Sequence, residues 1–362
     1  MPSKLPIRLS SSSLSQLMRE IFSRLGVPTE DCQIVVDTLL EASLSGYDSH
    51  GIMRIPLYVE GIRSGSIVPG APLETLNETA SIVHLDAHYG CGPVTAVESI
   101  RRASAKAATT GIGCASVLHC TDVARLGSYV KNPAEEGFVA LILVNDAGGN
   151  PFVAPWGSSQ PFISTNPIAA GIPWKEKSPI VVDISTSVAA GGKLKMLDAE
   201  SKDAPEGWLI DGDGQPTTDV GPALESPPLH ALLPLGGLIA GHKGFALSLI
   251  IDVLAGALSG AGCSAGKVEI TDVNGLFVMV IDPEQFVSRD NFKKSVENFV
   301  ADLKGVNRAP GIDEILIPGE RAARERSRRK IEGIPVETPV WEQIETILDE
   351  LSIENRYDQT EI

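Results

Sequence analysis

The chain has 362 residues, of which 43% are apolar and 21% are charged, and its formal net charge is −16. This length allows two or three domains with sizeable cores. The negative charge argues against a nucleic-acid partner or an acidic membrane surface, because neutralising phosphates requires a basic face. We therefore expect a globular protein that acts on small molecules.

Cysteine usage and the N-terminal segment bear on the location of the protein. The five cysteines are scattered and include no C-x-x-C pair, which is typical of reduced thiols. The segment MPSKLPIRLSSSSLSQ lacks the apolar core of a signal peptide, and we expect no stretch that approaches the roughly 20 apolar residues of a membrane span. These features predict a cytoplasmic protein without a membrane partner.

The N-terminal region is predicted to be helical. A run of serines provides an N-cap, and apolar residues then recur at helical spacing as far as Gly26. A second helix is expected from Thr29 to Gly46. The reactive segment GYDSHGIMR, which ends at Arg54, therefore follows the C-terminal end of a helix.

The middle of the chain changes to short apolar and β-branched runs that predict strands, namely SIVHLDA, CASVLHC, FVALILVND, SPIVVDIS and GLFVMVID. Before the last of them, HKGFALSLIIDVLAGALSG is long enough to form a buried helix. Residues 198–234 are predicted to be a long loop, and such loops are usually lids or dimer arms.

Helical periodicity returns in the last part of the chain, in SRDNFKKSVENFVADLKG, GERAARERSRRK and VWEQIETILDEL. The basic run RAARERSRRK is interpreted as a solvated helix face. Helices, a mixed α/β middle and helices again indicate an α+β fold.

The dinucleotide fingerprint requires a strand before it and a helix after it. One match occurs, GAGCSA at Gly260–Ala265, but a predicted helix precedes it and a strand-like segment follows it. The sequence therefore argues against an ordinary Rossmann domain.

Two other interpretations of the histidines are disfavoured. His84 and His88 have metal-ligand spacing only on a helix, and a strand would separate them by about 13 Å. No other cluster has ligand spacing, so we predict no metal. Ser49 and His50 are adjacent, and we expect their side chains to point apart, which disfavours a hydrolase. His119 and Cys120 are also adjacent, which disfavours them as the base and nucleophile of a cysteine enzyme for the same reason.

Taken alone, His50 fits a structural turn residue as well as a catalytic residue. The presence of Arg54 favours the catalytic interpretation. If a helix begins after Gly51, His50 and Arg54 lie one turn apart and can face the same cleft. An imidazole exchanges protons near neutral pH, and a guanidinium holds a carboxylate with two hydrogen bonds. This pair suits the reduction of a 2-oxo acid.

Three further positions are candidates. His119 ends a predicted strand, where functional residues are common, although a core histidine fits nearly as well. Asp183 ends another strand and precedes ISTSVAAGGK, which either binds phosphate or caps a helix. Lys243 adds positive charge at the start of the long apolar helix, which indicates that an anion binds there.

Several motifs together resemble those of the malate/L-lactate dehydrogenase family of the non-Rossmann type. They are DSHGIMR, LHCTDVARLGSY, APWG, STNPIAAGIP, VVDISTS, DGDGQPTTD, GHKGFALSLIIDVLAGALSG and PGER, in the family's order over nearly the whole chain. That family is unrelated to the ordinary lactate and malate dehydrogenases and includes diketogulonate reductase, ureidoglycolate dehydrogenase, sulfolactate dehydrogenase and piperideine-2-carboxylate reductase.

The resemblance implies a non-Rossmann nicotinamide-binding fold with a mainly antiparallel sheet and a helical subdomain built from both chain ends. The expected regions are a helical subdomain at 1–75, a mixed α/β cofactor-binding region at 76–285, and C-terminal helices at 286–362 that pack with the first region. It also implies a homodimer with active sites near the interface.

The resemblance further implies the roles of individual residues. His50 would donate the proton, and Ser49 and Arg54 would hold the substrate carboxylate. His119 matches a histidine proposed as the acid/base in some members, and Asp183 would lie near the nicotinamide and the catalytic histidine. NAD or NADP would be held by Asn166, Asp183, Ser185, Thr186, Ser187, His242, Lys243, Gly319 and Glu320.

One segment departs from the family pattern. Many relatives have a glycine shortly after the histidine that matches His119, whereas this chain has CTDVA there. Cys120 and Asp122 could therefore alter cofactor or substrate preference.

The sequence thus predicts an NAD(P)-dependent oxidoreductase that moves hydride between nicotinamide and C2 of a small 2-oxo or 2-hydroxy acid. Two alternatives stay open at this point. One is a reductase of cyclic 2-imino acids, which needs the same acid and clamp, and the other is a non-catalytic nicotinamide-binding relative.

Overall fold

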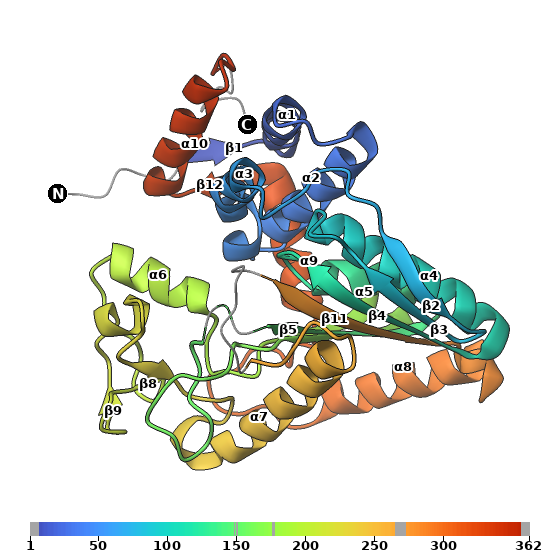
Figure 1. Ribbon diagram of the computed structural model, residues 1–362. Coiled ribbons are helices and arrows are strands. Elements are labelled where there is room, and N and C mark those ends of the chain that lie inside the picture. The colour runs from blue at the N-terminus through green and yellow to red at the C-terminus, as the bar shows by residue number, and fades with distance from the viewer. Residues whose placement is uncertain (1–6, 148, 150, 176–177, 265–272, 356–362) are drawn as a thin grey trace.

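The computed structural model describes residues 7–147, 149, 151–175, 178–264 and 273–355. These residues form a helical subdomain, a large sheet with helices on both faces, and a small lobe beside it (Figure 1). The α+β prediction is confirmed.

Both ends of the chain build the helical subdomain. Its helices are α1 (Ser11–Arg24), α2 (Thr29–Leu44), α3 (Ile55–Ser64) and α10 (Thr338–Glu350), and β1 (Ile7–Leu9) pairs antiparallel with β12 (Ile334–Val336). Ser10 caps α1 by accepting a hydrogen bond from the Ser13 N–H at 3.0 Å. Phe22, Leu39 and Trp341 are buried in one shared core. The predicted helices and the joining of the two chain ends are confirmed.

The large sheet has the strand order β2-β3-β4-β11-β5-β6-β7. The strands are β2 (Glu74–Glu78), β3 (Ile82–Asp86), β4 (Ile112–Cys120), β5 (Val139–Asp146), β6 (Ile168–Lys175), β7 (Ser178–Ile184) and β11 (Asn274–Ile281). β3 and β4 run parallel and are joined by α4 (Gly92–Thr110), whereas the other neighbours are antiparallel. All five predicted strands are present. Residues 265–272, which include Ala265 of the GAGCSA motif and the start of the strand-like segment that follows it, lie outside the described residues.

Helices cover both faces of this sheet. α4 and α5 (Gly127–Glu135) pack on one face, where Ile142 and Val144 are buried. α7 (Gly237–Ile251), its π-helical continuation η4 (Asp252–Ala257) and α8 (Arg289–Gly305) pack on the other, where Leu143 contacts Ile251. Alternate residues of β5 therefore point to opposite layers, as the strand period requires.

The prediction that the long apolar helix is buried is wrong. The segment Gly237–Ala257 has a mean hydropathy of 1.6, yet only 33% of it is buried. By length and composition alone it is able to cross a membrane, which corrects the expectation that no stretch approaches a membrane span. One such helix, selected by length and composition only, is weak evidence for a membrane span.

Residues 198–234 form a folded lobe rather than a plain loop. The lobe contains β8 (Leu209–Ile210), β9 (Pro216–Thr217), η3 (Gly221–Leu224) and β10 (Ala231–Leu232), and α6 (Gly191–Ala199) packs with it. Leu194, Leu209 and Leu232 share its small core. Short strands that lack strong periodicity gain their stability from this local packing, so the sequence pattern alone does not reveal them.

The C-terminal elements divide between the two larger units. After η5 (Pro283–Gln285), α8 packs on the sheet through Val300, which contacts Trp174. α9 (Glu320–Glu332) contacts α2, and α10 joins the helical core. The division of the chain at residues 75 and 285 stays a prediction.

Candidate functional site

The reactive segment forms two successive 3₁₀ turns, η1 (Asp48–His50) and η2 (Ile52–Arg54), before α3 begins. Gly51 lies between them and presses against α2, where a Cβ atom would lie only 2.1 Å from Ser43 Oγ. The Ser43 hydroxyl accepts a hydrogen bond from the Ile52 N–H at 2.9 Å. The close approach explains why glycine is needed here.

Asp48 is held from the other end of the chain. Two nitrogens of Arg329 on α9 donate to its carboxylate at 2.5 and 2.9 Å, and Arg329 also donates to the Ser43 carbonyl at 2.7 Å. Arg329 is buried, so the interpretation of RAARERSRRK as a purely solvated face is wrong at this position. Helix α9 thereby fixes the position of the turn that carries His50.

Ser49, His50 and Arg54 line the same cavity of about 380 Å³, as the spacing predicted for His50 and Arg54. The cavity lies between the helical subdomain, the ends of β5 and β11, and the start of α6. Its other walls are formed by Met53, Leu57, Asp122, Val123, Ala124, Leu126, Val144, Asn145, Asp146, Phe152, Ser164, Thr165, Pro167, Ala190, Gly191, Gly192, Lys195 and Asn274.

The expectation that Ser49 and His50 point apart is wrong. Ser49 Oγ lies 3.0 Å from His50 Nδ1, within hydrogen-bonding distance. The irregular backbone of the 3₁₀ turn allows two adjacent side chains to meet, which a strand would prevent. The hydroxyl thus orients the ring that faces the cavity.

The environment of His50 favours its neutral form. Burial lowers the pKa of His50 to about 4, with Arg54 and Arg125 adding to the effect and Asp122 opposing it. Without a bound anion, the imidazole is therefore uncharged at neutral pH and is able to accept a proton.

Arg54 is an incompletely satisfied donor. Its Nη1 lies 3.2 Å from the Asp122 carboxylate, which also accepts hydrogen bonds from the Tyr58 hydroxyl and the Ala124 N–H, each at 3.0 Å. Its Nε is buried without a hydrogen-bond partner among the described residues. The guanidinium thus retains capacity for an anionic ligand.

Asp183 is not part of the cavity wall. Its carboxylate accepts from Arg125 at 3.1 Å and from the Gly127 N–H at 2.9 Å. Burial raises the pKa of Asp183, an effect that Arg125 opposes. Arg125 also pairs with Glu41 of α2 at 2.9 Å, so this buried arginine connects the helical subdomain to β7.

His119 lies at the end of β4, as predicted, but it is not among the residues that line this cavity. Its Nδ1 is 2.9 Å from the Asp86 carboxylate, and its ring lies 4.9 Å from that of Tyr89. The structure therefore does not bring His119 together with His50.

The predicted cofactor residues fall into two groups. Asn166 is fully buried, between cavity-lining Thr165 and Pro167, and its Oδ1 has no partner among the described residues. Thr186 donates to the Thr165 and Asn166 carbonyls at 3.0 Å, which places the 185–187 turn behind that wall. Ser185 and Ser187 hydrogen-bond to each other at 3.1 Å.

The second group lies elsewhere. His242 and Lys243 are exposed, just after a break in α7 at Ala240, and His242 contacts the Trp156 ring. Gly319 and Glu320 begin α9, next to β7, and Glu320 pairs with Lys304 at 2.7 Å. None of these four lines the cavity.

The sequence reasoning missed several residues of the site. Lys195, Asn145 and Asn274 line the cavity, and Arg125 and Arg329 support it. Arg329 lies in a basic run that resembles a solvated face, and Arg125 lies in the CTDVARLG segment. The available signal for Arg125 was a single basic residue between the apolar neighbours Ala124 and Leu126.

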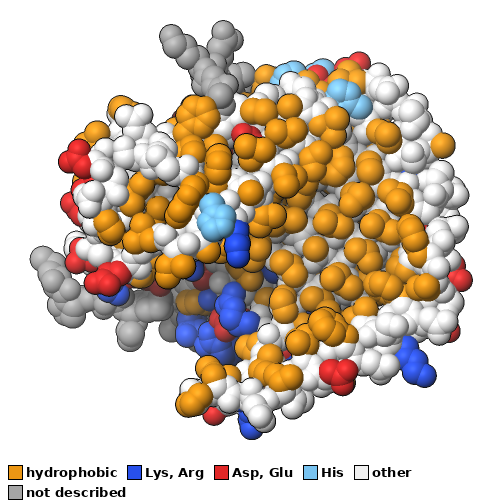
Figure 2. All heavy atoms as spheres, turned by 90° about the horizontal axis from the view of Figure 1, so that it is seen from below, with side chains coloured by type: hydrophobic (Ala, Val, Ile, Leu, Met, Phe, Trp, Pro, Cys, Tyr) orange, Lys and Arg blue, Asp and Glu red, His pale blue; other side chains and the backbone are white. Residues whose placement is uncertain are grey.

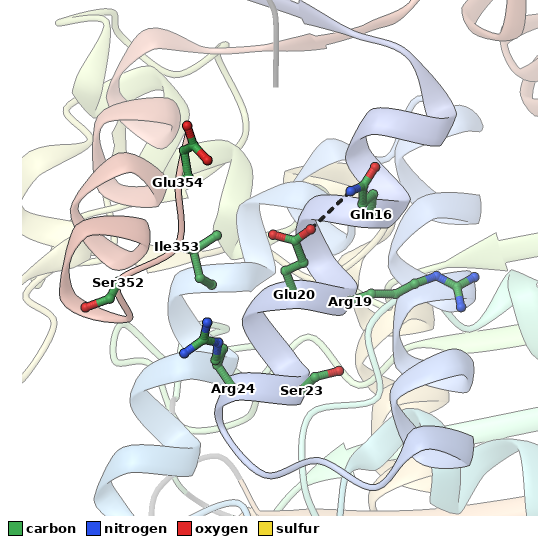
Figure 3. A pocket seen from close by; sticks show the side chains of 8 residues that line it. All are labelled: Gln16, Arg19, Glu20, Ser23, Arg24, Ser352, Ile353 and Glu354. Atoms are coloured by element: carbon green, nitrogen blue, oxygen red, sulfur yellow. Dashed lines mark hydrogen bonds between the residues drawn. The ribbon is translucent and has the colours of Figure 1, made fainter. Parts of the chain in front are cut away.

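A larger cavity, of about 550 Å³, lies between α1 and the residues that follow α10 (Figure 3). Its polar groups are side chains such as Arg24 and Glu354, and Gln16 hydrogen-bonds to Glu20 there at 3.1 Å. It contains none of the candidate site residues and no histidine. The smaller cavity at His50 is therefore the candidate active site.

Comparisons with known proteins identify the family of the chain. The family model described as malate/L-lactate dehydrogenase matches residues 9–345. The malate dehydrogenase of Pyrococcus horikoshii is 36% identical over 355 residues, which cover 96% of each chain.

Solved structures are similar over the same extent. The structure of malate dehydrogenase from Pyrococcus horikoshii OT3 has a TM-score of 0.86 at 34% identity and covers 96% of this chain and 97% of that one. The Δ1-piperideine-2-carboxylate reductase from Pseudomonas syringae has a TM-score of 0.82 at 31% identity, covering 94% and 99%.

Proposed function

The chain belongs to the malate/L-lactate dehydrogenase family, and we propose that it interconverts a small 2-hydroxy acid and its 2-oxo acid with a nicotinamide cofactor. The observation that carries this proposal is the shared cavity of His50 and Arg54, which combines a proton-transfer group with an anion clamp. A 2-hydroxy acid requires the first at its C2 oxygen and the second at its C1 carboxylate.

His50 transfers the proton in this proposal. In the oxidation direction, the neutral imidazole accepts the proton of the substrate hydroxyl while hydride leaves C2. In the reverse direction, the protonated imidazole donates to the carbonyl oxygen. The Ser49 hydroxyl, 3.0 Å from Nδ1, orients the ring. A substrate carboxylate at Arg54 offsets the positive charge that lowers the pKa of His50 and so favours its protonated form.

Arg54 binds the substrate carboxylate, together with Ser49. Asp122, which accepts a hydrogen bond from the Tyr58 hydroxyl, anchors one edge of the guanidinium, and the remaining N–H groups donate to an anion. Because Arg54 and His50 are only four residues apart on a rigid double turn, the carboxylate and the reacting oxygen are held in a defined relation.

The residues around Asn166 fit a nicotinamide. Thr165 and Pro167 line the cavity wall on either side of the buried Asn166, whose Oδ1 is an acceptor without a partner among the described residues. When bound, the cofactor supplies or accepts the hydride. Roles for Asp183, Ser185, Thr186, Ser187, His242, Lys243, Gly319 and Glu320 in holding NAD or NADP, and for His119 in catalysis, stay predictions.

A homodimer is the second part of the proposal. The exposed apolar residues of α7 and η4 include Leu247, Ile250 and Val253, and Leu258 follows directly after η4; each is more than 40% exposed. Figure 2, viewed from the side of α7 and α8, shows hydrophobic side chains spread across this face. Apolar patches of this kind mark protein interfaces, and a second copy of the chain is the proposed occupant. A cytoplasmic location likewise stays a prediction.

The test is an assay of NADH and NADPH oxidation by the purified full-length chain against a panel of 2-oxo acids and cyclic 2-imino acids. Turnover of at least one 2-oxo acid, with the reverse reaction from its 2-hydroxy acid, is the expected result. Turnover of cyclic imines alone would replace the proposed substrate class. Failure to bind either dinucleotide in a fluorescence titration would remove the enzymatic proposal.

A further inference from the structure

Helix α6 contributes a lysine to the candidate active site that no sequence motif singled out. Gly191, Gly192 and Lys195 line the cavity, and positions spaced by three and four residues share one helix face. A Cβ atom on Gly192 would lie 3.1 Å from Ser49 Cβ, so the first turn of α6 packs against the turn that carries His50. Lys195 follows on the same face.

Two cations among the described residues that line the cavity, Arg54 and Lys195, differ in their pairing. Arg54 forms an ion pair with Asp122 at 3.2 Å, which offsets much of its charge. Lys195 forms no ion pair with any carboxylate of the described residues. Two carboxylates, Asp122 and Asp146, line the same cavity, and within the described residues the ammonium of Lys195 forms an ion pair with neither of them.

The neighbouring lysine on α6 points elsewhere. Lys193 is also exposed, but its ammonium lies 5.8 Å from the centre of the Trp208 ring in a cation–π arrangement, and it does not line the cavity. Two lysines of the same helix thus have the same charge and different surroundings, which makes Lys193 a matched control.

We propose that Lys195 is an anion-binding residue of this site, which holds an acidic group other than the carboxylate bound by Arg54. The inference rests on the proposed function. The acidic group belongs either to the substrate, as a second carboxylate or a sulfonate, or to the dinucleotide, as a phosphate. The ammonium of Lys195 reaches the cavity wall from an exposed position, so it attracts a bound anion with partial screening by solvent.

The experiment compares Lys195→Gln, Lys195→Arg and Lys193→Gln in the full chain. KM is measured for a 2-hydroxy monocarboxylic acid, for a 2-hydroxy dicarboxylic acid and for the dinucleotide. Lys195→Gln removes a charge-assisted hydrogen bond and should therefore raise the KM of the anion concerned roughly tenfold. Lys195→Arg, which keeps the charge, restores most of the affinity, and Lys193→Gln leaves every KM unchanged.

The two sources of the anion give different patterns. A rise confined to the dicarboxylic acid assigns Lys195 to the substrate, and a rise confined to the dinucleotide assigns it to the cofactor phosphate. Unchanged KM values for all three ligands in Lys195→Gln would overturn the proposal. Lys195 is exposed, so the variant is expected to fold, and circular dichroism checks this.

A binding measurement separates this inference from the proposed function. Calorimetry with succinate, an unreactive dicarboxylate, and fluorescence titration with NADH and NADPH compare Lys195→Gln with Lys193→Gln without turnover. If the natural chain binds one of these anions but oxidises no hydroxy acid, the proposed function fails. Weaker binding of that anion by Lys195→Gln than by Lys193→Gln would still support Lys195 as an anion-binding residue. Equal binding by both variants contradicts it.

Discussion

Arg329 and Asp48, which are 281 residues apart in the chain, form a paired interaction with hydrogen bonds of 2.5 and 2.9 Å. The buried guanidinium also donates to Glu325 and to the Ser43 carbonyl. Through this interaction the C-terminal part of the chain holds the turn on which Ser49 and His50 lie.

Asp48→Ala is expected to lower the free energy of unfolding by about 1 to 3 kcal/mol, because it leaves a buried charge without one of its partners. It should also lower turnover, since the turn loses its anchor. Denaturant unfolding and steady-state kinetics measure both effects. Arg328→Ala on the same helix removes the ion pairs of an exposed arginine with Glu325 and Glu332 and leaves the Arg329–Asp48 pair in place, so both quantities should stay nearly unchanged.

His50→Ala is expected to reduce turnover by roughly 10² to 10⁴, the usual contribution of a general acid–base group, while dinucleotide binding persists. Turnover by stopped-flow or steady-state assay and a fluorescence titration give the two values. Turnover equal to that of the natural chain would exclude His50 as the proton-transfer group.

Arg54→Lys should raise the KM for carboxylate substrates, because a single ammonium replaces a guanidinium that donates two parallel hydrogen bonds. The control is Arg63→Lys on the same helix α3, whose partner is Glu350 at the surface. If the two variants show the same KM, Arg54 does not bind the substrate.

The pH dependence of hydroxy-acid oxidation tests the charges around His50. The base must be deprotonated, so kcat/KM should fall as the pH decreases through about 4, the pKa of His50 in the free protein. Arg54→Gln removes a cation that lowers this pKa and should move the acidic limb to higher pH. Asp122→Asn removes a carboxylate that raises it and should move the limb to lower pH. Shifts in one common direction would contradict the assigned charges.

Ile250→Glu places a charge in the exposed apolar face of α7, where Ile250 is 52% exposed. If this face joins two copies of the chain, the substitution should convert a dimer to a monomer in analytical ultracentrifugation, because burying an unpaired carboxylate is costly. Ile331→Glu, at an exposed apolar position of α9, is the control. A dimer that survives Ile250→Glu would place the interface elsewhere.

The sequence predicted much of the local structure and part of the site. Helical periodicity located α1, α2, α8, α9 and α10 within a few residues, because an amphipathic pattern is set by neighbours along the chain. The prediction that α7 is buried was wrong, because an apolar composition does not show whether the protein core or another surface covers the helix. The sequence pattern also missed the short strands of the lobe around α6, whose packing is local to that lobe.

The sequence by itself indicated that His50 and Arg54 would face one cleft if a helix began after Gly51; the structure brings both to one cavity on two successive 3₁₀ turns instead. Only the tertiary structure decided which charges surround them. Asp122 pairs with Arg54, Arg125 joins α2 to β7, Arg329 holds Asp48, and Lys195 enters from α6. These partners come from distant segments, and ion pairing between distant segments leaves no periodic pattern in the sequence.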